Sequence, residues 1–382
     1  MTGSLQIKSG IFYVVLNAKD RAGNRKQKWI NTGLPVKGNK RKAEQQLLTL
    51  LAEYQGTGYI EPSKVLLCDL VRDWVSMSQP KLQATTYMNY VHMTSKHICP
   101  YFEELGLLLK NVTPDVIQRY HHAKLKSGLN PNTIIKHHAV IRSALQYAVK
   151  SRLIKENPCD FVDKPKRQKY NGTYYNAEEI KQLLAVAKGS PIEVPIFLAA
   201  YFGLRRSEVI GLKWSAIDFT SGLLAVRHKV VRALENGKLV NIATDELKTH
   251  SSYRTLPLDE SLLEYLTGLK RQQTENRELC GTSYCAEYED YVCVNPLGVL
   301  LNPDHVSGAF QSLLKRHRLK PIRFHDLRHS CASLLLSLGY SMKEIQEWLG
   351  HSNYQTTANL YSHVDPRNRK SMIQGLSGAL KL

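Results

Sequence analysis

The sequence lacks the features of a membrane or secreted protein. None of its apolar runs approaches the roughly 18 residues that a membrane-spanning helix needs, and the richest stretch, residues 192–204, is interrupted by Glu193 and Pro195. The first ten residues, MTGSLQIKSG, lack the apolar core of a secretion signal. We therefore expect a cytoplasmic chain.

Cysteine is scarce and irregularly spaced. The seven cysteines are odd in number and scattered, which favours reduced thiols over a disulfide framework. Cys280, Cys285 and Cys293 cluster loosely and could hold zinc with a fourth ligand, but their spacing matches no common zinc module. The sequence also has no GxxxxGK[ST] phosphate loop and no HExxH zinc motif. We predict no cofactor and no metal site, and leave the role of these three cysteines open.

Acidic residues are also in short supply. Asp and Glu number 33 against 52 Lys and Arg, a formal net charge of +19. Such a surplus indicates a polyanionic partner, because each neutralised phosphate releases condensed counterions. Charge alone leaves nucleic acid, an acidic membrane surface, a ribosomal partner and an unspecific basic surface open.

The first 60 residues are expected to form a separate module. Short strands are predicted over residues 11–16 and 27–32, followed by a helix over residues 40–54. Ten basic residues against three acidic ones favour a surface that lies on DNA, with a protein-binding module as the alternative. The candidate DNA contacts are Arg25, Lys26 and Lys28.

Residues 64–162 are predicted to be wholly helical. The expected helices span residues 65–78, 84–101, 113–126 and 132–152. Thr113 before Pro114 is a good helix start. The last helix carries a polar run with candidate DNA contacts at Lys136 and Arg142, among Lys136, His137, His138, Arg142 and Lys150. This run indicates either a solvated helix face or a bundle that grips DNA.

A basic, aperiodic segment over residues 163–172 predicts a linker. Residues 173–382 then form the third part, with Asn176 as a helix cap. Its strands are expected near residues 223–229, 239–247 and 254–258, with helices elsewhere. The predicted fold class is multidomain α+β: a small sheet-plus-helix module, an all-α domain, and a mainly α domain with a small antiparallel sheet.

Four separated segments of this last domain carry residues suited to phosphate chemistry. Arg205 follows a Gly-Leu turn, and Glu208, three residues on, is spaced to hold it. Lys248 is expected at the tip of a hairpin formed by the second and third predicted strands. His325 and Arg328, at i and i+3, share one face of a helix start.

The fourth segment is WLGHSNYQTTANLYSH. Gly350 ends a helix, His351 follows at the turn, and Thr356 and Thr357 are spaced to cap a helix that carries Tyr361. Each segment alone is weak, because surface Arg–Glu pairs, turn lysines and packing tyrosines are common.

Together, the four segments resemble the tyrosine recombinase (phage integrase) family. That family's signature is an Arg, a hairpin Lys, an H-x-x-R pair, a His or Trp after Leu-Gly, and a Tyr about ten residues later. The matching positions are Arg205, Lys248, His325, Arg328, His351 and Tyr361. Arg206 is a neighbouring alternative, but only Arg205 both follows Gly-Leu and precedes Glu208 by three.

The resemblance spans about residues 176–364 and implies a reaction. Arg205 and Arg328 would clamp the phosphate, and Tyr361 would attack it to give a 3′-phosphotyrosine. His325 would accept the phenolic proton, His351 would bond to the phosphate, and Lys248 would protonate the leaving oxygen.

The family also implies partners and domain roles. The helical part is similar to its core-site-binding domain, and the N-terminal module is similar to the arm-site-binding domain of phage and conjugative-transposon integrases. The expected partners are double-stranded DNA, a homo-oligomer (a tetramer on DNA), and accessory excision or DNA-bending proteins, with no membrane. The apolar set after residue 365 packs either on its own domain or on a neighbouring subunit: Met372, Ile373, Leu376 and Leu380.

Other DNA-acting proteins remain alternatives. A type IB topoisomerase would use nearly the same residues to relax DNA, although the basic N-terminal module favours site-specific recombination. A non-catalytic DNA-binding protein would explain the charge but not the ordered catalytic series. A metal-dependent nuclease or transposase would need clustered carboxylates.

Overall fold

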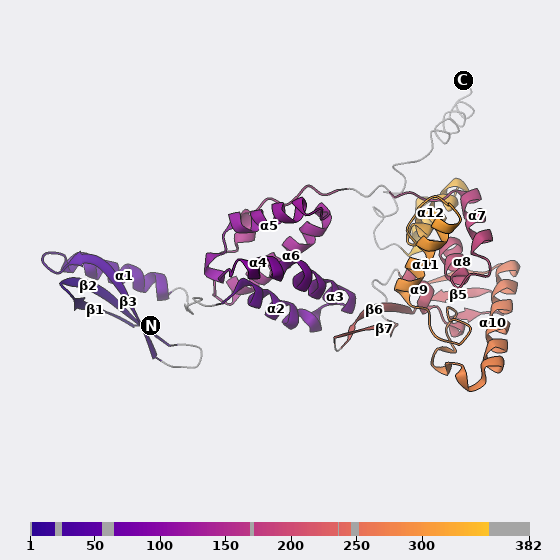
Figure 1. Cartoon of the computed structure of the whole chain (residues 1–382), viewed down its shortest axis with the longest axis horizontal. Coiled ribbons are helices and arrows are strands. Elements are labelled where there is room, and N and C mark those ends of the chain that lie inside the picture. Colours follow the sequence, from indigo (N-terminus) through magenta and orange to yellow (C-terminus); the bar gives the residue numbers. More distant parts are fainter. Residues whose placement is uncertain are drawn as a thin grey trace, which may run out of the picture. The chain divides into compact units, whose positions relative to one another are not determined.

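The computed structural model describes residues 2–19, 25–55, 65–168, 172–235, 237–245 and 252–350 (Figure 1). The chain divides into two compact units, residues 1–169 and 170–382, which we describe separately. Within the described residues, helices are either too short or too polar to cross a bilayer.

The N-terminal module is a three-stranded antiparallel sheet with one helix. The sheet has the order β1-β2-β3, and its elements are β1 (Thr2–Lys8), β2 (Ile11–Lys19), β3 (Arg25–Pro35) and α1 (Lys40–Gln55). The two predicted strands and the helix are confirmed, whereas β1 was missed because Gly, Ser and Gln interrupt its apolar residues. The side of the sheet that α1 covers is the side of Gly3, where an added Cβ would lie 2.9 Å from Leu47 and 3.1 Å from Leu51.

The register of the sheet places Lys28 on the α1 side. Gly3 pairs with Leu16, and Leu16 pairs with Lys28. Residues directly opposite each other on neighbouring strands point to the same face, and Leu16 is buried under the helix at 1% exposure. Lys28 therefore does not project from the open face of the sheet.

The helical domain contains the predicted helices. They are α2 (Leu67–Ser78), α3 (Ala84–Met93), α4 (Cys99–Glu104), α5 (Pro114–Lys126) and α6 (Pro131–Lys150). One predicted helix, residues 84–101, is divided by a π-helical turn, η2 (Thr94–Ile98). The Thr113 hydroxyl caps α5 by accepting a hydrogen bond from the Val116 amide at 3.4 Å, as the sequence predicted.

The polar run on α6 divides between the core and the surface. His137 and His138 are buried, at 0% and 1% exposure, so the interpretation that they face solvent or DNA was wrong. Burial lowers the pKa of both imidazoles to about 4. Lys136, Arg142 and Lys150 are exposed, which leaves them as the part of the run that a polyanion can reach.

In its described residues, the second unit is mainly helical with two small antiparallel sheets. Its helices are α7 (Ala177–Ala187), α8 (Glu193–Phe202), α9 (Arg206–Gly211), α10 (Glu260–Cys280), α11 (Pro303–Arg316), α12 (Asp326–Ser337) and α13 (Met342–Leu349). One sheet has the order β4-β5-β8, with β4 (Ile217–Asp218), β5 (Leu223–Val226) and β8 (Arg254–Pro257). The other is a hairpin of β6 (Lys229–Glu235) and β7 (Lys238–Thr244). Asn176 caps α7 in a capping box with Glu179, as predicted.

Within the described residues, the two strands that were expected to form a hairpin around Lys248 do not pair with each other. Strand β7 pairs with β6 across a turn at Gly237, and β8 pairs with β5. The reason is packing: in β8, Leu256 (2% exposed) lies opposite Leu224 (0%), and both belong to the core of the unit. The segment over residues 245–253 therefore connects two different sheets, and the predicted strand over residues 223–229 is split between β5 and β6.

Helix α8 is the centre of this unit. Its sequence, EVPIFLAAYF, is apolar on nearly all sides, so it is buried between other helices and contacts α7, α9 and α12. It ends at Gly203, which is left-handed with φ of 60°. A Cβ on Gly203 would collide with the Leu349 side chain at the end of α13. The end of α8, the start of α9, α12 and the end of α13 therefore meet at one place.

Candidate active site

Arg205 stands at this meeting point as the residue before α9. Its Nη1 lies 2.5 Å from Glu208 Oε1, and its Nη2 donates to the Gly350 carbonyl at 2.9 Å. The side chain remains 30% exposed. The predicted Arg205–Glu208 pair is confirmed. Glu208 and the Gly350 carbonyl hold the guanidinium, and its exposed part remains accessible to a ligand.

Glu208 is a buried carboxylate between two arginines. Its side chain is 3% exposed, and Oε2 accepts hydrogen bonds from the Arg254 Nη2 at 3.0 Å and the Arg205 backbone amide at 3.1 Å. Burial on its own would raise the pKa of Glu208, but Arg254 first, then Arg205 and Arg328, outweigh it and lower the pKa. The carboxylate is therefore ionised and can orient both of its partners.

Arg328 lies almost completely inside the protein, at 1% exposure. It projects from the first turn of α12, and its Nη1 and Nη2 donate to the carbonyls of Gly203 at 2.6 Å and Leu349 at 2.5 Å. Burial lowers the pKa of this guanidinium, and Glu208 opposes the shift. Arginine starts from so high a pKa that it stays charged.

The two predicted arginines converge on the end of α13. Arg328 bonds to the carbonyl of Leu349, and Arg205 bonds to the carbonyl of the next residue, Gly350. Carbonyls at a helix C-terminus carry partial negative charge and are natural partners for cations. The residue that follows in the chain is His351. The structure thus brings Arg328 together with Arg205 and Glu208, although more than a hundred residues of sequence separate Arg328 from that pair.

His325 lies directly before α12, one turn away from His329. The two rings make an edge-to-face contact with their centroids 5.2 Å apart. The His325 side chain is itself exposed to solvent, but the dense protein around it, with the neighbouring His329 and Arg328, lowers the pKa of His325 to about 4. The imidazole is therefore neutral near pH 7 and has a ring nitrogen available as a proton acceptor.

Arg254, the first residue of β8, is a site residue that the sequence analysis missed. Its side chain is 6% exposed and pairs with Glu208. A signal was present, because residues 254 and 256 of a strand share a face and Leu256 is apolar. An arginine on that inward face needs a buried acidic partner. The sequence analysis did not draw this inference, because it expected residues 254–258 to form a hairpin around Lys248.

Arg206 points away from the site. Its Nη1 donates to the Ser307 hydroxyl at 2.7 Å and to the Pro303 carbonyl at 3.1 Å, both in the first turns of α11. This supports Arg205, rather than its neighbour, as the phosphate ligand.

Several predicted site residues lie outside the described residues: Lys248, His351 and Tyr361. The apolar set of the C-terminal tail lies there too. Among the loosely clustered cysteines, Cys293 is buried at 1% exposure. Within the part of the chain that the structure describes, no three His, Cys, Asp or Glu side chains are grouped to hold a metal ion.

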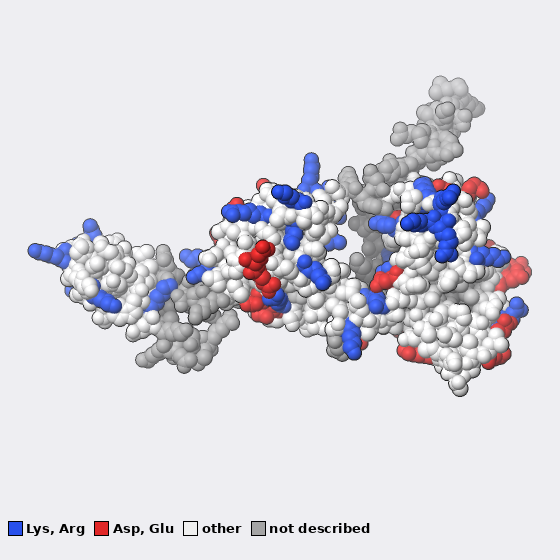
Figure 2. All heavy atoms as spheres, viewed as in Figure 1, with Lys and Arg blue, Asp and Glu red and all other residues white. Residues whose placement is uncertain are grey.

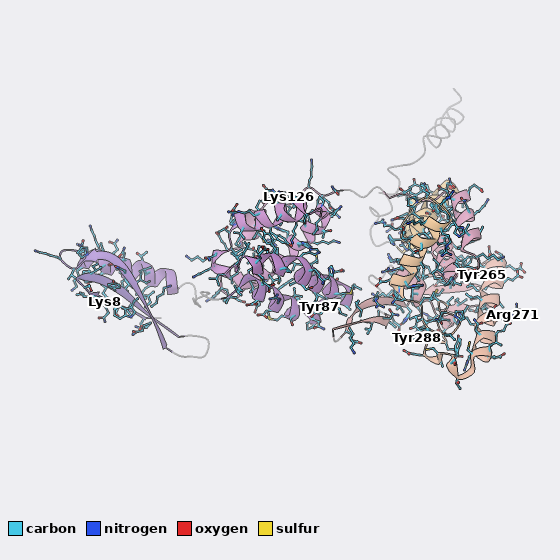
Figure 3. All side chains as sticks on the ribbon, in the orientation of Figure 1. Lys8, Tyr87, Lys126, Tyr265, Arg271 and Tyr288 are labelled. Carbon is cyan, nitrogen blue, oxygen red and sulfur yellow. The ribbon has the colours of Figure 1, made fainter. Side chains whose placement is uncertain are left out.

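The candidate DNA contacts differ in their surroundings. Lys136 is exposed on α6, and Arg142 forms an exposed ion pair in which its Nε lies 2.8 Å from Asp160 Oδ1. Figure 2 shows further basic side chains spread over the helical domain, and Lys126, at the end of α5, projects outward (Figure 3). The side chains of Arg25 and Lys26 lie outside the described set.

Comparison with known proteins identifies related chains. Residues 174–368 match the model of the phage integrase family, and residues 66–170 match the phage integrase SAM-like domain. A tyrosine recombinase XerC-like protein of Caldanaerobacter subterraneus subsp. tengcongensis is 28% identical over 328 residues, covering 82% of this chain and 83% of the relative. The ICEBs1 integrase of Bacillus subtilis is 25% identical over 353 residues, covering 91% and 92%.

Solved structures share the fold. The Tn1549 transposon integrase in complex with a circular intermediate DNA has a TM-score of 0.66 at 20% identity, covering 82% of this chain and 99% of that one. A lambda integrase tetramer bound to a Holliday junction has a TM-score of 0.58 at 18% identity, covering 93% and 94%. The helix-rich architecture with small antiparallel sheets is thus the integrase fold.

Proposed function

Because the chain belongs to the phage integrase family and is a site-specific tyrosine recombinase, we propose that Tyr361 is its nucleophile and that Arg205 and Arg328 clamp the phosphate it attacks. The observation that carries this proposal is the convergence of the two guanidiniums on the consecutive carbonyls of Leu349 and Gly350. They meet where the chain enters the segment that contains the predicted His351 and Tyr361.

The clamp acts on charge. A phosphodiester gains negative charge as an oxygen nucleophile attacks it, and guanidiniums donate paired hydrogen bonds to its non-bridging oxygens. Glu208 keeps Arg205 in a single orientation, and the helix packing around Arg328 keeps that residue rigid. Prearranged donors of this kind require little reorganisation in the transition state.

The proton transfers fall to the remaining predicted residues. Tyr361 forms a bond from its phenolic oxygen to phosphorus and releases its proton to His325, whose imidazole is neutral near pH 7. The bond from phosphorus to the 5′ oxygen breaks, and Lys248 supplies a proton to that oxygen. His351 donates a hydrogen bond to the phosphate. The product is a 3′-phosphotyrosine and a free 5′ hydroxyl, and attack by a 5′ hydroxyl from a second duplex rejoins the DNA.

The chain's substrate in this proposal is duplex DNA, and its working form is a tetramer. The Tn1549 and lambda integrases were solved with DNA, the latter also as a tetramer on a Holliday junction. We assign core sites to the helical domain (residues 64–162), through exposed cations such as Lys126, Lys136 and Arg142. Residues 163–172 are the linker to the catalytic domain (residues 173–382). Accessory excision or DNA-bending proteins are expected partners.

The N-terminal module (residues 1–60) is proposed to bind arm-type sites through the face of its sheet opposite α1. That face carries Asn17, Gln27, Trp29 and Asn31, with Trp29 at 50% exposure and Gln27 bonded to Asn17 at 3.0 Å. Asn and Gln amides can form paired hydrogen bonds with adenine in the major groove. Lys28 lies on the α1 side and stays a candidate DNA contact outside this face.

The test is covalent capture on a nicked suicide duplex that contains the cognate crossover site, with EDTA present. Wild-type protein is expected to give a denaturation-resistant protein–DNA adduct, and Tyr361→Phe to give none. Arg205→Ala and Arg328→Ala are expected to slow adduct formation a hundredfold or more. Tyr354→Phe is the matched control, because it removes the phenol that lies seven residues earlier in the sequence. An intact adduct in Tyr361→Phe would show that another residue is the nucleophile.

A further inference from the structure

The buried ion pair between Arg254 and Glu208 has no role in the chemistry proposed so far. We propose that Arg254 is a positioning residue: through Glu208 it holds Arg205 in the orientation that meets the scissile phosphate. This inference rests on the proposed function.

The two oxygens of Glu208 are divided between the two arginines. Oε1 lies 2.5 Å from Arg205 Nη1, and Oε2 accepts from Arg254 Nη2 at 3.0 Å. A free carboxylate prefers a bidentate pair with one guanidinium. If Oε2 lost Arg254, only the Arg205 backbone amide would still bond to it, and Glu208 could turn both oxygens toward the side chain of Arg205. The guanidinium would then be drawn toward the carboxylate and partly neutralised, which would weaken it as a phosphate ligand.

The charges of the cluster agree with this role. Arg205, Arg254 and Arg328 all lower the pKa of the single carboxylate of Glu208, so the cluster holds three positive charges against one negative charge. Arg254 is 6% exposed and Arg205 is 30% exposed. The buried Arg254 therefore neutralises much of the charge of the Glu208 carboxylate. The more exposed Arg205 is then neutralised less and can interact more strongly with the phosphate.

The same residue anchors the chain after Lys248. Arg254 Nη1 donates to the Ser252 carbonyl at 3.1 Å, and the buried Ser252 hydroxyl accepts from Arg205 Nη1 at 3.4 Å. The Tyr253 hydroxyl also donates to the Asp245 carbonyl at 2.5 Å, so the described residues just before and just after positions 246–251 are bonded to each other. Through Ser252, the residues that follow position 251 are also bonded to the arginine cluster.

The experiment uses the full chain and the nicked duplex, with protein in excess so that the rate of a single cleavage is measured. Arg254→Met removes the charge and keeps much of the side-chain length. We expect its cleavage rate to fall roughly a hundredfold, the loss that small misplacements of catalytic groups produce. Arg254→Lys is expected to be intermediate, because an ammonium keeps the charge beside Glu208 but lacks the two separate nitrogens with which the guanidinium bonds to Glu208 and Ser252. The control is Arg206→Met, which removes the arginine that follows Arg205 in the sequence and that contacts α11.

Two readouts separate positioning from a general loss of structure. The double variant Glu208→Gln with Arg254→Met should be no slower than the slower single variant, because both changes act on the same orientation of Arg205. A duplex with a neutral methylphosphonate at the scissile position removes a charge that Arg205 offsets. On that duplex, the defects of Arg205→Ala and Arg254→Met should shrink together, whereas a folding defect would slow both duplexes equally.

Cleavage by Arg254→Met at the wild-type rate, or the same defect on both duplexes, would overturn the inference. If the Met variant does not fold, the same comparison is made with Arg254→Lys. The proposed function fails separately: in that case wild-type protein forms no adduct, or Tyr361→Phe forms one.

Discussion

Replacing Gly203 by alanine tests how tightly the active site depends on the contact between α8 and α13. Gly203 has φ of 60°, and an added Cβ would meet the Leu349 side chain and lie 3.4 Å from Cys331 Sγ. The left-handed backbone costs an L-residue about 1 kcal/mol. Forcing the buried Leu349 aside adds about 1–3 kcal/mol of overpacking. We therefore expect Gly203→Ala to lower the free energy of unfolding by about 2–4 kcal/mol.

Gly339→Ala is the matched control. Gly339 also has positive φ, at 92°, but nothing lies within 4 Å of its added Cβ, so it isolates the backbone cost of about 1 kcal/mol. Urea unfolding of the full chain, followed through the transition of the second unit, measures both variants. Gly203→Ala should also slow cleavage, because the Gly203 carbonyl is an acceptor for Arg328. Equal destabilisation by the two changes would refute the close contact.

Two further predictions concern the helical domain. His137 and His138 have folded-state pKa values of about 4, below the unfolded value near 6.5. Above pH 6.5 both imidazoles are neutral in the folded and the unfolded chain, so their burial carries no proton-linked cost. As the pH falls from 6.5 toward 4, the unfolded chain takes up protons that the folded chain does not, and the free energy of unfolding decreases. The expected decrease in the free energy of unfolding is about 2 kcal/mol per residue at pH 5. Urea unfolding midpoints at pH 7.5 and pH 5 measure it. The same midpoint at both pH values would contradict the burial of the two histidines. For DNA binding, Lys136→Ala should reduce the slope of log affinity against log salt concentration by about 1. It should change the free energy of unfolding by less than about 0.5 kcal/mol. An unchanged slope would show that Lys136 does not contact DNA.

Local sequence was sufficient for most elements and for the pattern of the site. Asn176 and Thr113 cap α7 and α5 as predicted, because a cap bonds to an amide only a few residues away. Glu208 holds Arg205 for the same reason, since three residues separate them at a helix start. These contacts are made within one helical turn.

Predictions that depended on distant partners failed. Strand β8 contains residues that suit a hairpin with β7, but Leu256 packs opposite Leu224 of β5 and takes β8 into a different sheet. His137 and His138 looked like part of a cationic surface because the polar residues beside them are exposed, yet both imidazoles face the helical core. Pairing and burial depend on which surfaces meet, and neighbouring residues do not determine this.

The sequence by itself determined most of the helices and the order of Arg205, His325 and Arg328, on which the resemblance to tyrosine recombinases rests. Only the tertiary structure decided that Arg254 pairs with Glu208 and that the two predicted arginines bond to the carbonyls of Leu349 and Gly350 at the end of α13. The physical reason is the distance along the sequence between the interacting residues. A capping hydrogen bond or a helix face involves residues within one or two helical turns of each other. A buried charge cluster forms only where elements distant in sequence pack together and exclude water.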